Sequence, residues 1–154
     1  MIGDYHCTAY LANCVLTKVI SVCHNYFLKL PVRDKKFSEV EKLKNKVILL
    51  ASDQLGKGET ELGEGILETF FTILKQKEEL PAAVFCMNRG VFTLTESSLV
   101  SLQLKELEEK GIDVLACKAC VDFYELNDKL VAGKISGIAQ FIELASKYEV
   151  ITLS

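Results

Sequence analysis

Two cysteines separated by two residues, in the segment Cys117-Lys118-Ala119-Cys120, are the residues best suited to chemistry. The apolar run from Ile112 to Ala116 predicts a buried strand that ends directly before Cys117. If a helix begins in the turn that follows, its free N–H groups stabilise a thiolate, which is the nucleophilic form of cysteine. Lys118 adds a positive charge nearby in the sequence. We therefore predict a reactive thiol at Cys117, with Cys120 as its assistant.

Other uses of this cysteine pair stay open at this level. Both thiols can serve as small buried apolar side chains. A Cys-x-x-Cys pair near βαβ units is also the usual sign of a thioredoxin-like dithiol redox protein, but this pair follows the third predicted strand, and no proline follows it. Structural zinc needs a second ligand pair, and neither Cys nor His occurs after Cys120. We predict no metal site and no cofactor.

Two further features carry weaker signals. Cys86 lies near the end of another apolar run, Ala82 to Met87, where it either approaches Cys117 or occupies the core, which is the more frequent place for a cysteine. The segment Ser52 to Thr60 contains Gly56 and Gly58, whose backbone can approach an anion. It lacks the complete phosphate-binding motifs, so a plain glycine-rich turn is the preferred interpretation.

The elements that position these residues alternate in type along the chain. Apolar runs predict strands at 46–52, 82–87, 112–116 and 149–153, and helical spacing of apolar residues predicts helices at 61–77, 96–110 and 138–147. This alternation predicts a mainly parallel sheet with helices on both faces. Ligands of such sheets bind beyond the carboxyl ends of the strands. We therefore expect function in three loops: Ser52 to Thr60, Asn88 to Thr95 and Cys117 to Leu126.

Composition sets the broad class. The chain has 154 residues, a formal net charge of −3 and six cysteines, and its charges are interspersed, which argues against nucleic acid as a partner. The aliphatic content and the absence of a secretory pattern favour reduced thiols, a cytoplasmic location and no membrane segment. We predict an α/β domain over 46–154, preceded by a partly helical extension over 1–45. The cysteines and histidines of that extension match no zinc motif: Cys7, Cys14, Cys23, His6 and His24.

Three stretches of the predicted domain carry a family resemblance. They read VILLASDQLGKGETELGEGIL, FCMNRGVFTLTESS and LKELEEKGIDVLACKACVDFY, in this order. With them the chain resembles the DsrE-like sulfurtransferase family, and within it the C-terminal domain of YedF-type selenium-metabolism proteins. The sulfur-accepting cysteine of the family corresponds to Cys117, and Cys120 corresponds to a second cysteine of the YedF-like subgroup. Residues 1–45 lack the Cys-Pro-x-Pro motif of the TusA-like domain that commonly begins those proteins.

The resemblance implies a flavodoxin-like three-layer α/β sandwich and a sulfur-relay protein. Cys117 would accept sulfane sulfur as a persulfide from a donor protein and pass it to an acceptor, with a TusA-like partner, while Cys120 would resolve the persulfide by forming a disulfide. Related domains form homo-oligomers, so self-association is expected as well. Two alternatives remain: a dithiol redox protein that uses Cys117 and Cys120, and a non-catalytic ligand-binding or assembly subunit.

Overall fold

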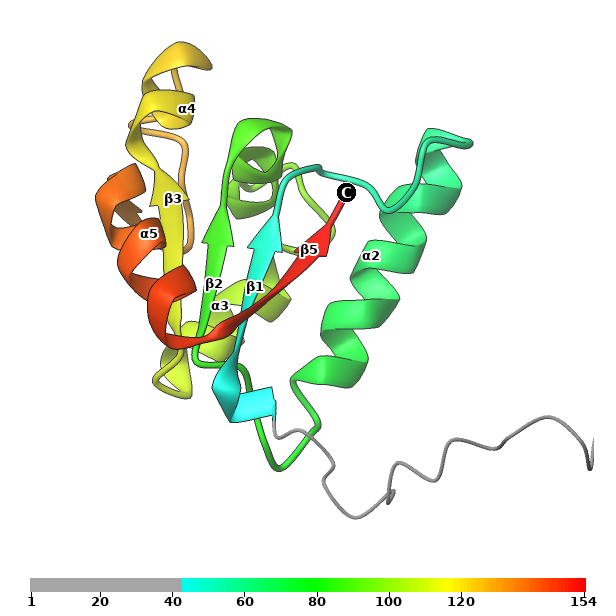
Figure 1. Ribbon diagram of the computed structural model, residues 1–154. Helices are drawn as coiled ribbons and strands as arrows, with labels where there is room; N and C mark the ends of the chain where they lie inside the picture. Colours follow the sequence, from blue (N-terminus) through cyan, green and yellow to red (C-terminus); the bar gives the residue numbers. More distant parts are fainter. Residues whose placement is uncertain (1–42) are drawn as a thin grey trace, which may run out of the picture. The chain divides into compact units, whose positions relative to one another are not determined.

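Residues 43–154 are those that the computed structural model describes, and they alternate strands with helices (Figure 1). The strands are β1 (Lys46–Leu50), β2 (Ala83–Cys86), β3 (Asp113–Cys117), β4 (Lys134–Ser136) and β5 (Glu149–Leu153). The α-helices are α2 (Thr60–Leu74), α3 (Ser101–Glu109), α4 (Lys118–Phe123) and α5 (Ile138–Lys147), and the 3₁₀ helices are η1 (Leu43–Asn45) and η2 (Asn88–Leu94). The expected extension over 1–45 lies, except for its last three residues, outside the described part.

The strands form one five-stranded sheet in the order β4-β3-β2-β1-β5, and every pairing is parallel. All strands therefore end at the same edge of the sheet, which is the upper edge in Figure 1. The predicted α/β class with a parallel sheet is confirmed. β1 to β4 follow one another across the sheet, and the chain then returns past them so that β5 pairs with the outer edge of β1.

Side chains that alternate along the strands divide the core into two layers. On one face, Ile48 and Val84 pack with Leu67 of α2 and Leu104 of α3. On the other face, Phe85 and Leu115 pack with Phe141 and Leu144 of α5, and the rings of Phe85 and Phe141 lie 5.1 Å apart between centroids. Helices thus cover both faces of the sheet, which confirms the three-layer arrangement.

The structure corrects several predicted boundaries and adds two elements. Helix α3 begins at Ser101 rather than 96, because Ser98 Oγ accepts the backbone N–H of Val100 and holds a turn before the helix. Helix α2 ends at Leu74, before the predicted 77. The edge strand β4 was not predicted, because it has only three residues and its side chains are largely solvent-exposed, which leaves no apolar run. Helix α4 occupies the loop expected after Cys117.

A close approach of two backbones positions the segment after β2. A Cβ atom added at Gly90 would lie 2.0 Å from the carbonyl oxygen of Leu50, so only glycine lets η2 rest on the end of β1. The backbone N–H of Met87 also donates to the Leu50 carbonyl at 2.9 Å. These contacts hold η2 over the carboxyl ends of β1 and β2, where the predicted functional loops meet.

No helix within residues 43–154 is long and apolar enough to cross a membrane. Cys7, Cys14, Cys23, His6 and His24 lie outside the described residues.

Candidate functional site

The two cysteines of the Cys-x-x-Cys segment lie side by side at the carboxyl end of β3. Cys117 is the last residue of β3, and its side chain belongs to the α5 face of the sheet, where it is only 7% exposed. Helix α4 begins immediately afterwards, which meets the condition stated for a stabilised thiolate, and Cys120 lies within it, partly exposed. Cys120 packs against the group of buried side chains that contains Cys117, and the neighbouring Cys117 raises the pKa of Cys120. The structure thus joins the two predicted site residues into one thiol pair.

The loop after β2 supplies a donor to this pair. The backbone N–H of Asn88, the first residue of η2, donates to Sγ of Cys120 at 3.0 Å. Asn88 adopts a left-handed conformation with a φ of 49°, which asparagine enters more readily than most non-glycine residues. Its side-chain oxygen accepts a hydrogen bond of 3.0 Å from the hydroxyl of Tyr124, and the Tyr124 ring packs on Phe92 with centroids 4.8 Å apart. Two of the three loops expected to carry function therefore meet at Cys120.

Three influences act on the pKa of Cys120. Burial raises this pKa above the ordinary value for cysteine, the N–H of Asn88 lowers it, and the neighbouring Cys117 raises it. The net direction is upward because removal from water disfavours the charged thiolate most strongly.

Lys118 does not place its charge on the thiols. Its ammonium group donates to the Asp122 carboxylate at 2.9 Å, one helical turn further on, and this bond lowers the pKa of Asp122 below its ordinary value. The expectation that Lys118 provides a positive charge to the cysteines is therefore corrected, because that charge is paired within α4.

Cys86 belongs to a different environment from the thiol pair. It is fully buried in the layer between the sheet and helices α2 and α3, and its Sγ lies 4.0 Å from the hydroxyl oxygen of Thr93. Burial raises the pKa of Cys86 to about 12, so the thiol stays protonated at neutral pH. Of the two possibilities that the sequence left open for Cys86, the structure supports the core residue.

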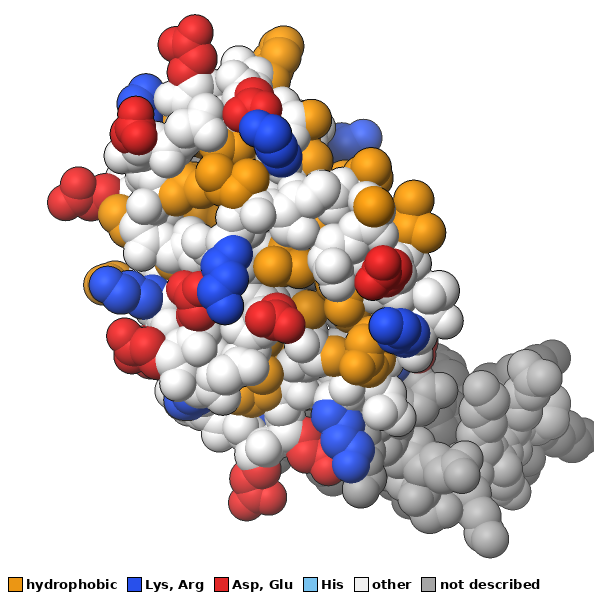
Figure 2. Space-filling view, turned by 90° about the vertical axis from the view of Figure 1, so that its left-hand side faces the viewer, with side chains coloured by type: hydrophobic (Ala, Val, Ile, Leu, Met, Phe, Trp, Pro, Cys, Tyr) orange, Lys and Arg blue, Asp and Glu red, His pale blue; other side chains and the backbone are white. Residues whose placement is uncertain are grey.

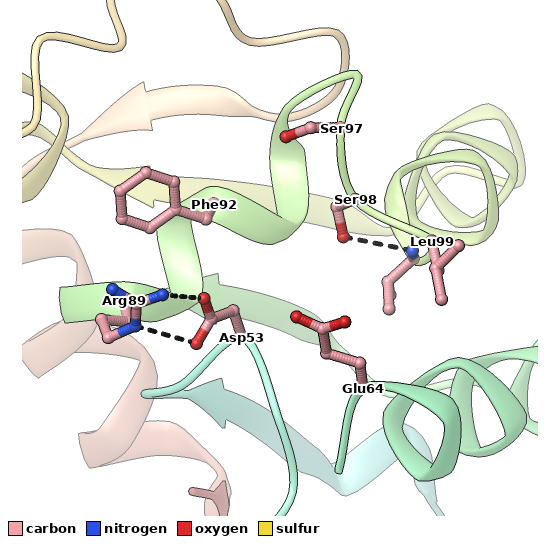
Figure 3. A pocket seen from close by; sticks show the side chains of 8 residues that line it. Asp53, Glu64, Arg89, Phe92, Ser97, Ser98 and Leu99 are labelled. Atoms are coloured by element: carbon pink, nitrogen blue, oxygen red, sulfur yellow. Dashed lines mark hydrogen bonds and ion pairs between the residues drawn. The ribbon is translucent and has the colours of Figure 1, made fainter. Parts of the chain in front are cut away.

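A cavity of about 250 Å³ lies beside η2 on the α2 and α3 side of the sheet (Figure 3). Arg89 forms two hydrogen bonds with the carboxylate of Asp53, at 3.0 and 2.5 Å, and its guanidinium lies 5.2 Å from the centre of the Phe92 ring. This ion pair joins the loop after β1 to the loop after β2. The remaining lining residues are Glu64, Ser97, Ser98, Leu99 and Val100.

The charge of this cavity bears on the anion site considered for the segment 52–60. Asp53 and Glu64 both line the cavity, and the one guanidinium present, that of Arg89, is already paired with Asp53. The balance is negative, which opposes an anionic ligand. The sequence interpretation did not single out Asp53 and Arg89, although Asp53 directly follows one predicted strand and Arg89 lies two residues beyond another.

Within residues 43–154, no group of three or more His, Cys, Asp and Glu side chains is arranged to hold a metal ion.

The chain thus contains an α/β domain with an all-parallel five-stranded sheet, and two cysteines lie at the carboxyl edge of that sheet. The DsrE/DsrF-like family profile matches residues 65–153, more than half of the chain, so the protein belongs to the DsrE/DsrF-like family. No curated protein sequence matches the chain.

Three solved structures are similar to this chain, and the first of them supports the fold. The YchN protein from E. coli superposes with a TM-score of 0.51 at 14% identity, over 71% of this chain and 99% of that protein. A conserved protein of unknown function from Bacteroides thetaiotaomicron gives 0.49 at 12% identity, over 73% of this chain and 98% of the other. A protein of unknown function from Methanobacterium thermoautotrophicum gives 0.48 at 16% identity, over 70% and 97%. At these identities the YchN match supports the fold alone.

Proposed function

We propose that this protein is a sulfur carrier, in which the thiol pair of Cys117 and Cys120 holds sulfane sulfur as a persulfide. The observation that carries the proposal is the pair itself: two adjacent thiols at the carboxyl edge of a parallel sheet, one of them receiving a backbone N–H from Asn88. Membership of the DsrE/DsrF-like family is consistent with this chemistry, since the resemblance of residues 46–154 to DsrE-like sulfurtransferases implies a sulfur-accepting cysteine at position 117.

The chemical cycle needs only thiols and a donor persulfide. A thiolate of the pair attacks the terminal sulfur of a donor R–S–SH, the donor S–S bond breaks, and R–S⁻ leaves and takes up a proton. An acceptor thiolate then removes the terminal sulfur in the same way. In the arrangement implied by the resemblance, Cys117 accepts the sulfur, and Cys120 attacks the Cys117 sulfur to form a disulfide while hydrosulfide departs.

The proposed partners are a donor or acceptor protein of the TusA-like kind and further copies of this chain. For self-association we assign the surface of β4 and α5. Three isoleucines there are exposed, namely Ile135 at 45%, Ile138 at 53% and Ile142 at 62%. Among the strands of residues 43–154, β4 pairs with β3 alone and forms one edge of the sheet, and such edges are suited to further pairing. Figure 2 shows hydrophobic side chains among charged side chains of both signs on the side of the molecule that carries β3, α4 and α5 in Figure 1.

The YedF-type subgroup is the finer assignment that we propose. It rests on the second cysteine, Cys120, and on the quoted stretches around both cysteines. Selenium in place of sulfur would follow the same exchange chemistry, so a selenium donor belongs in the same assay.

Adjacent thiols also favour a second candidate, a dithiol redox protein. The two candidates differ in their products: a redox protein cycles between the dithiol and a Cys117–Cys120 disulfide and carries no extra sulfur. A redox titration that shows reversible disulfide formation, without any persulfide after exposure to a donor, would support this second candidate instead.

The test is mass spectrometry of the intact protein and its peptides after incubation with glutathione persulfide. We expect a gain of one sulfur atom on the peptide that contains Cys117 and Cys120. The double variant Cys117→Ser/Cys120→Ser should gain none, and Cys86→Ala, which removes a thiol outside the pair, should load like the wild type. Normal loading of the double variant would exclude the thiol pair as the carrier. Failure of the wild type to load would support the non-catalytic alternative.

A further inference from the structure

We infer that Cys120, rather than Cys117, is the thiol that first receives sulfur, and that the backbone N–H of Asn88, held by Tyr124, is the donor that supports it. This inference rests on the proposed sulfur-carrier function and reverses the roles of the two cysteines within it.

Access to the sulfur atom separates the two cysteines. Cys117 is 7% exposed and packs with Phe85 and Leu115 on the α5 face of the sheet. Cys120 is partly exposed on α4. A donor persulfide must place its terminal sulfur and its departing sulfur in line with the attacking Sγ, which requires open space in front of that atom. Cys120 meets this requirement better than Cys117, because more of the residue is exposed to solvent.

The environment of Asn88 points to the same sulfur. Asn88 has a φ of 49°, in the left-handed region that asparagine enters more readily than most other non-glycine residues. Here the hydroxyl of Tyr124 donates to the Asn88 side chain at 3.0 Å, and the Tyr124 ring is fixed against Phe92. The backbone N–H of Asn88 then points at Cys120 Sγ, at 3.0 Å. A donor aimed in advance at a sulfur stabilises negative charge on it without reorganisation.

The contacts of Cys120 act on its thiolate in opposite directions. The Asn88 N–H favours the thiolate and lowers the pKa of Cys120, whereas burial and the neighbouring Cys117 raise that pKa. A raised pKa leaves a smaller thiolate fraction, and the greater nucleophilicity of each thiolate offsets only part of that loss. The Asn88 N–H is therefore the contact that supports the reactive form of Cys120.

The step balances without an oxidant. Cys120 thiolate attacks the terminal sulfur of the donor persulfide, a new S–S bond forms on Cys120, the donor S–S bond breaks, and the donor thiolate leaves and is protonated. Cys117 belongs to the group of buried side chains against which Cys120 packs, so its thiol lies near the loaded residue. Attack of the Cys117 thiolate on Cys120 Sγ forms the disulfide and expels hydrosulfide, so the sulfane sulfur is reduced while the two thiols are oxidised.

The first experiment compares single variants with glutathione persulfide as the donor and peptide mass spectrometry as the readout. Cys117→Ser should still load sulfur, on Cys120, at a rate near that of the wild type. Cys120→Ser and Cys120→Ala should load at least about tenfold more slowly, because the accessible nucleophile is lost. If both Cys120 variants load Cys117 at the wild-type rate, the inference is overturned and the sulfur-carrier proposal stands. If the wild type itself never loads, that proposal fails.

The second experiment tests the positioning role of Tyr124 through the pH profile of Cys120 alkylation by iodoacetamide, measured in Cys117→Ser protein. Tyr124→Phe and Asn88→Gly each remove the side-chain bond but keep the N–H, and glycine tolerates the left-handed backbone. Each should shift the profile upward by about half a pH unit, as expected for a weakened hydrogen bond. The double variant should shift no further than either single variant.

Tyr148→Phe is the matched control, because it removes a phenolic hydroxyl at the end of α5, on a different element. Its profile should match that of the parent. Profiles that coincide in all variants would overturn the role of Asn88 and Tyr124, even if Cys120 proves to be the accepting thiol.

Discussion

Cys86 and Cys117 lie on neighbouring strands, yet their side chains belong to opposite faces of the sheet. Cys86 is level with Ala116 in the register of β2 and β3, so Cys117 is one residue beyond it. Successive residues of a strand alternate between faces, which directs the Cys117 sulfur toward α5 and the Cys86 sulfur toward α2 and α3. Cys86 is therefore separated from the thiol pair by the sheet itself.

The burial of Cys86 predicts a loss of stability at alkaline pH. Its folded-state pKa is about 12, against an ordinary value of 9.0. The unfolded chain releases the thiol proton above pH 9 and the folded one does not, so this stability is complete below pH 9 and is lost between 9 and 12. The free energy of unfolding should fall by about 1.4 kcal/mol per pH unit in that window.

Urea unfolding of the wild type and of Cys86→Ala, at pH 8 and at about pH 10.5, measures this contribution. Tyrosine and lysine titrate in both proteins, so the comparison isolates the thiol. The wild type should lose about 2 kcal/mol more than Cys86→Ala between these conditions. Parallel losses would show that Cys86 ionises freely in the folded state.

Gly90 should not tolerate even the smallest side chain. The added Cβ would meet the carbonyl oxygen of Leu50 at 2.0 Å, and a backbone atom of a central strand cannot move aside. We expect Gly90→Ala to destabilise the protein by about 3 kcal/mol or more, measured as a lower Tm and a lower urea midpoint. Gly65→Ala is the control: no atom lies within 4 Å of its added Cβ, so it should stabilise α2 by about 0.5 to 1 kcal/mol.

The Asp53–Arg89 pair should contribute modestly to stability. Its two side chains are 19% and 59% exposed, respectively, so water screens the attraction, although the bidentate geometry favours it. A double-mutant cycle with Asp53→Asn and Arg89→Gln should give a coupling of about 1 kcal/mol at low salt, and less at high salt. Strict additivity of the two variants would mean that the pair does not hold the loops together.

The proposed self-association should depend on the apolar surface of α5. Light scattering coupled to size-exclusion chromatography should give an oligomer for the wild type and a smaller species for Ile138→Lys/Ile142→Lys, because a charged side chain is costly to bury. The control variant Leu62→Lys/Leu102→Lys changes two residues of comparable exposure, 63% and 69%, on α2 and α3. It should keep the wild-type mass. A monomeric wild type, or dissociation of the control, would contradict the assigned surface.

The sequence alone determined the elements whose pattern repeats locally. The apolar run of β1, the helical spacing of α2 and the strand that ends at Cys117 could be predicted because each depends on burial of residues near one another in the chain. Parallel pairing followed from the alternation of elements, and the position of both cysteines at a sheet edge followed from parallel pairing. Strand β4 could not be predicted, because an exposed strand of three residues has no such pattern.

Only the tertiary structure decided which side chains meet. The Asn88 N–H and Cys120 Sγ are 32 residues apart in sequence, and Asp53 and Arg89 are 36 apart. Both contacts depend on how closely η2 approaches the end of β1, which the absence of a side chain at Gly90 permits. The separation of Cys86 from Cys117 depended likewise on the register of two strands. Such relationships arise from packing between distant segments, which no local pattern of residues encodes.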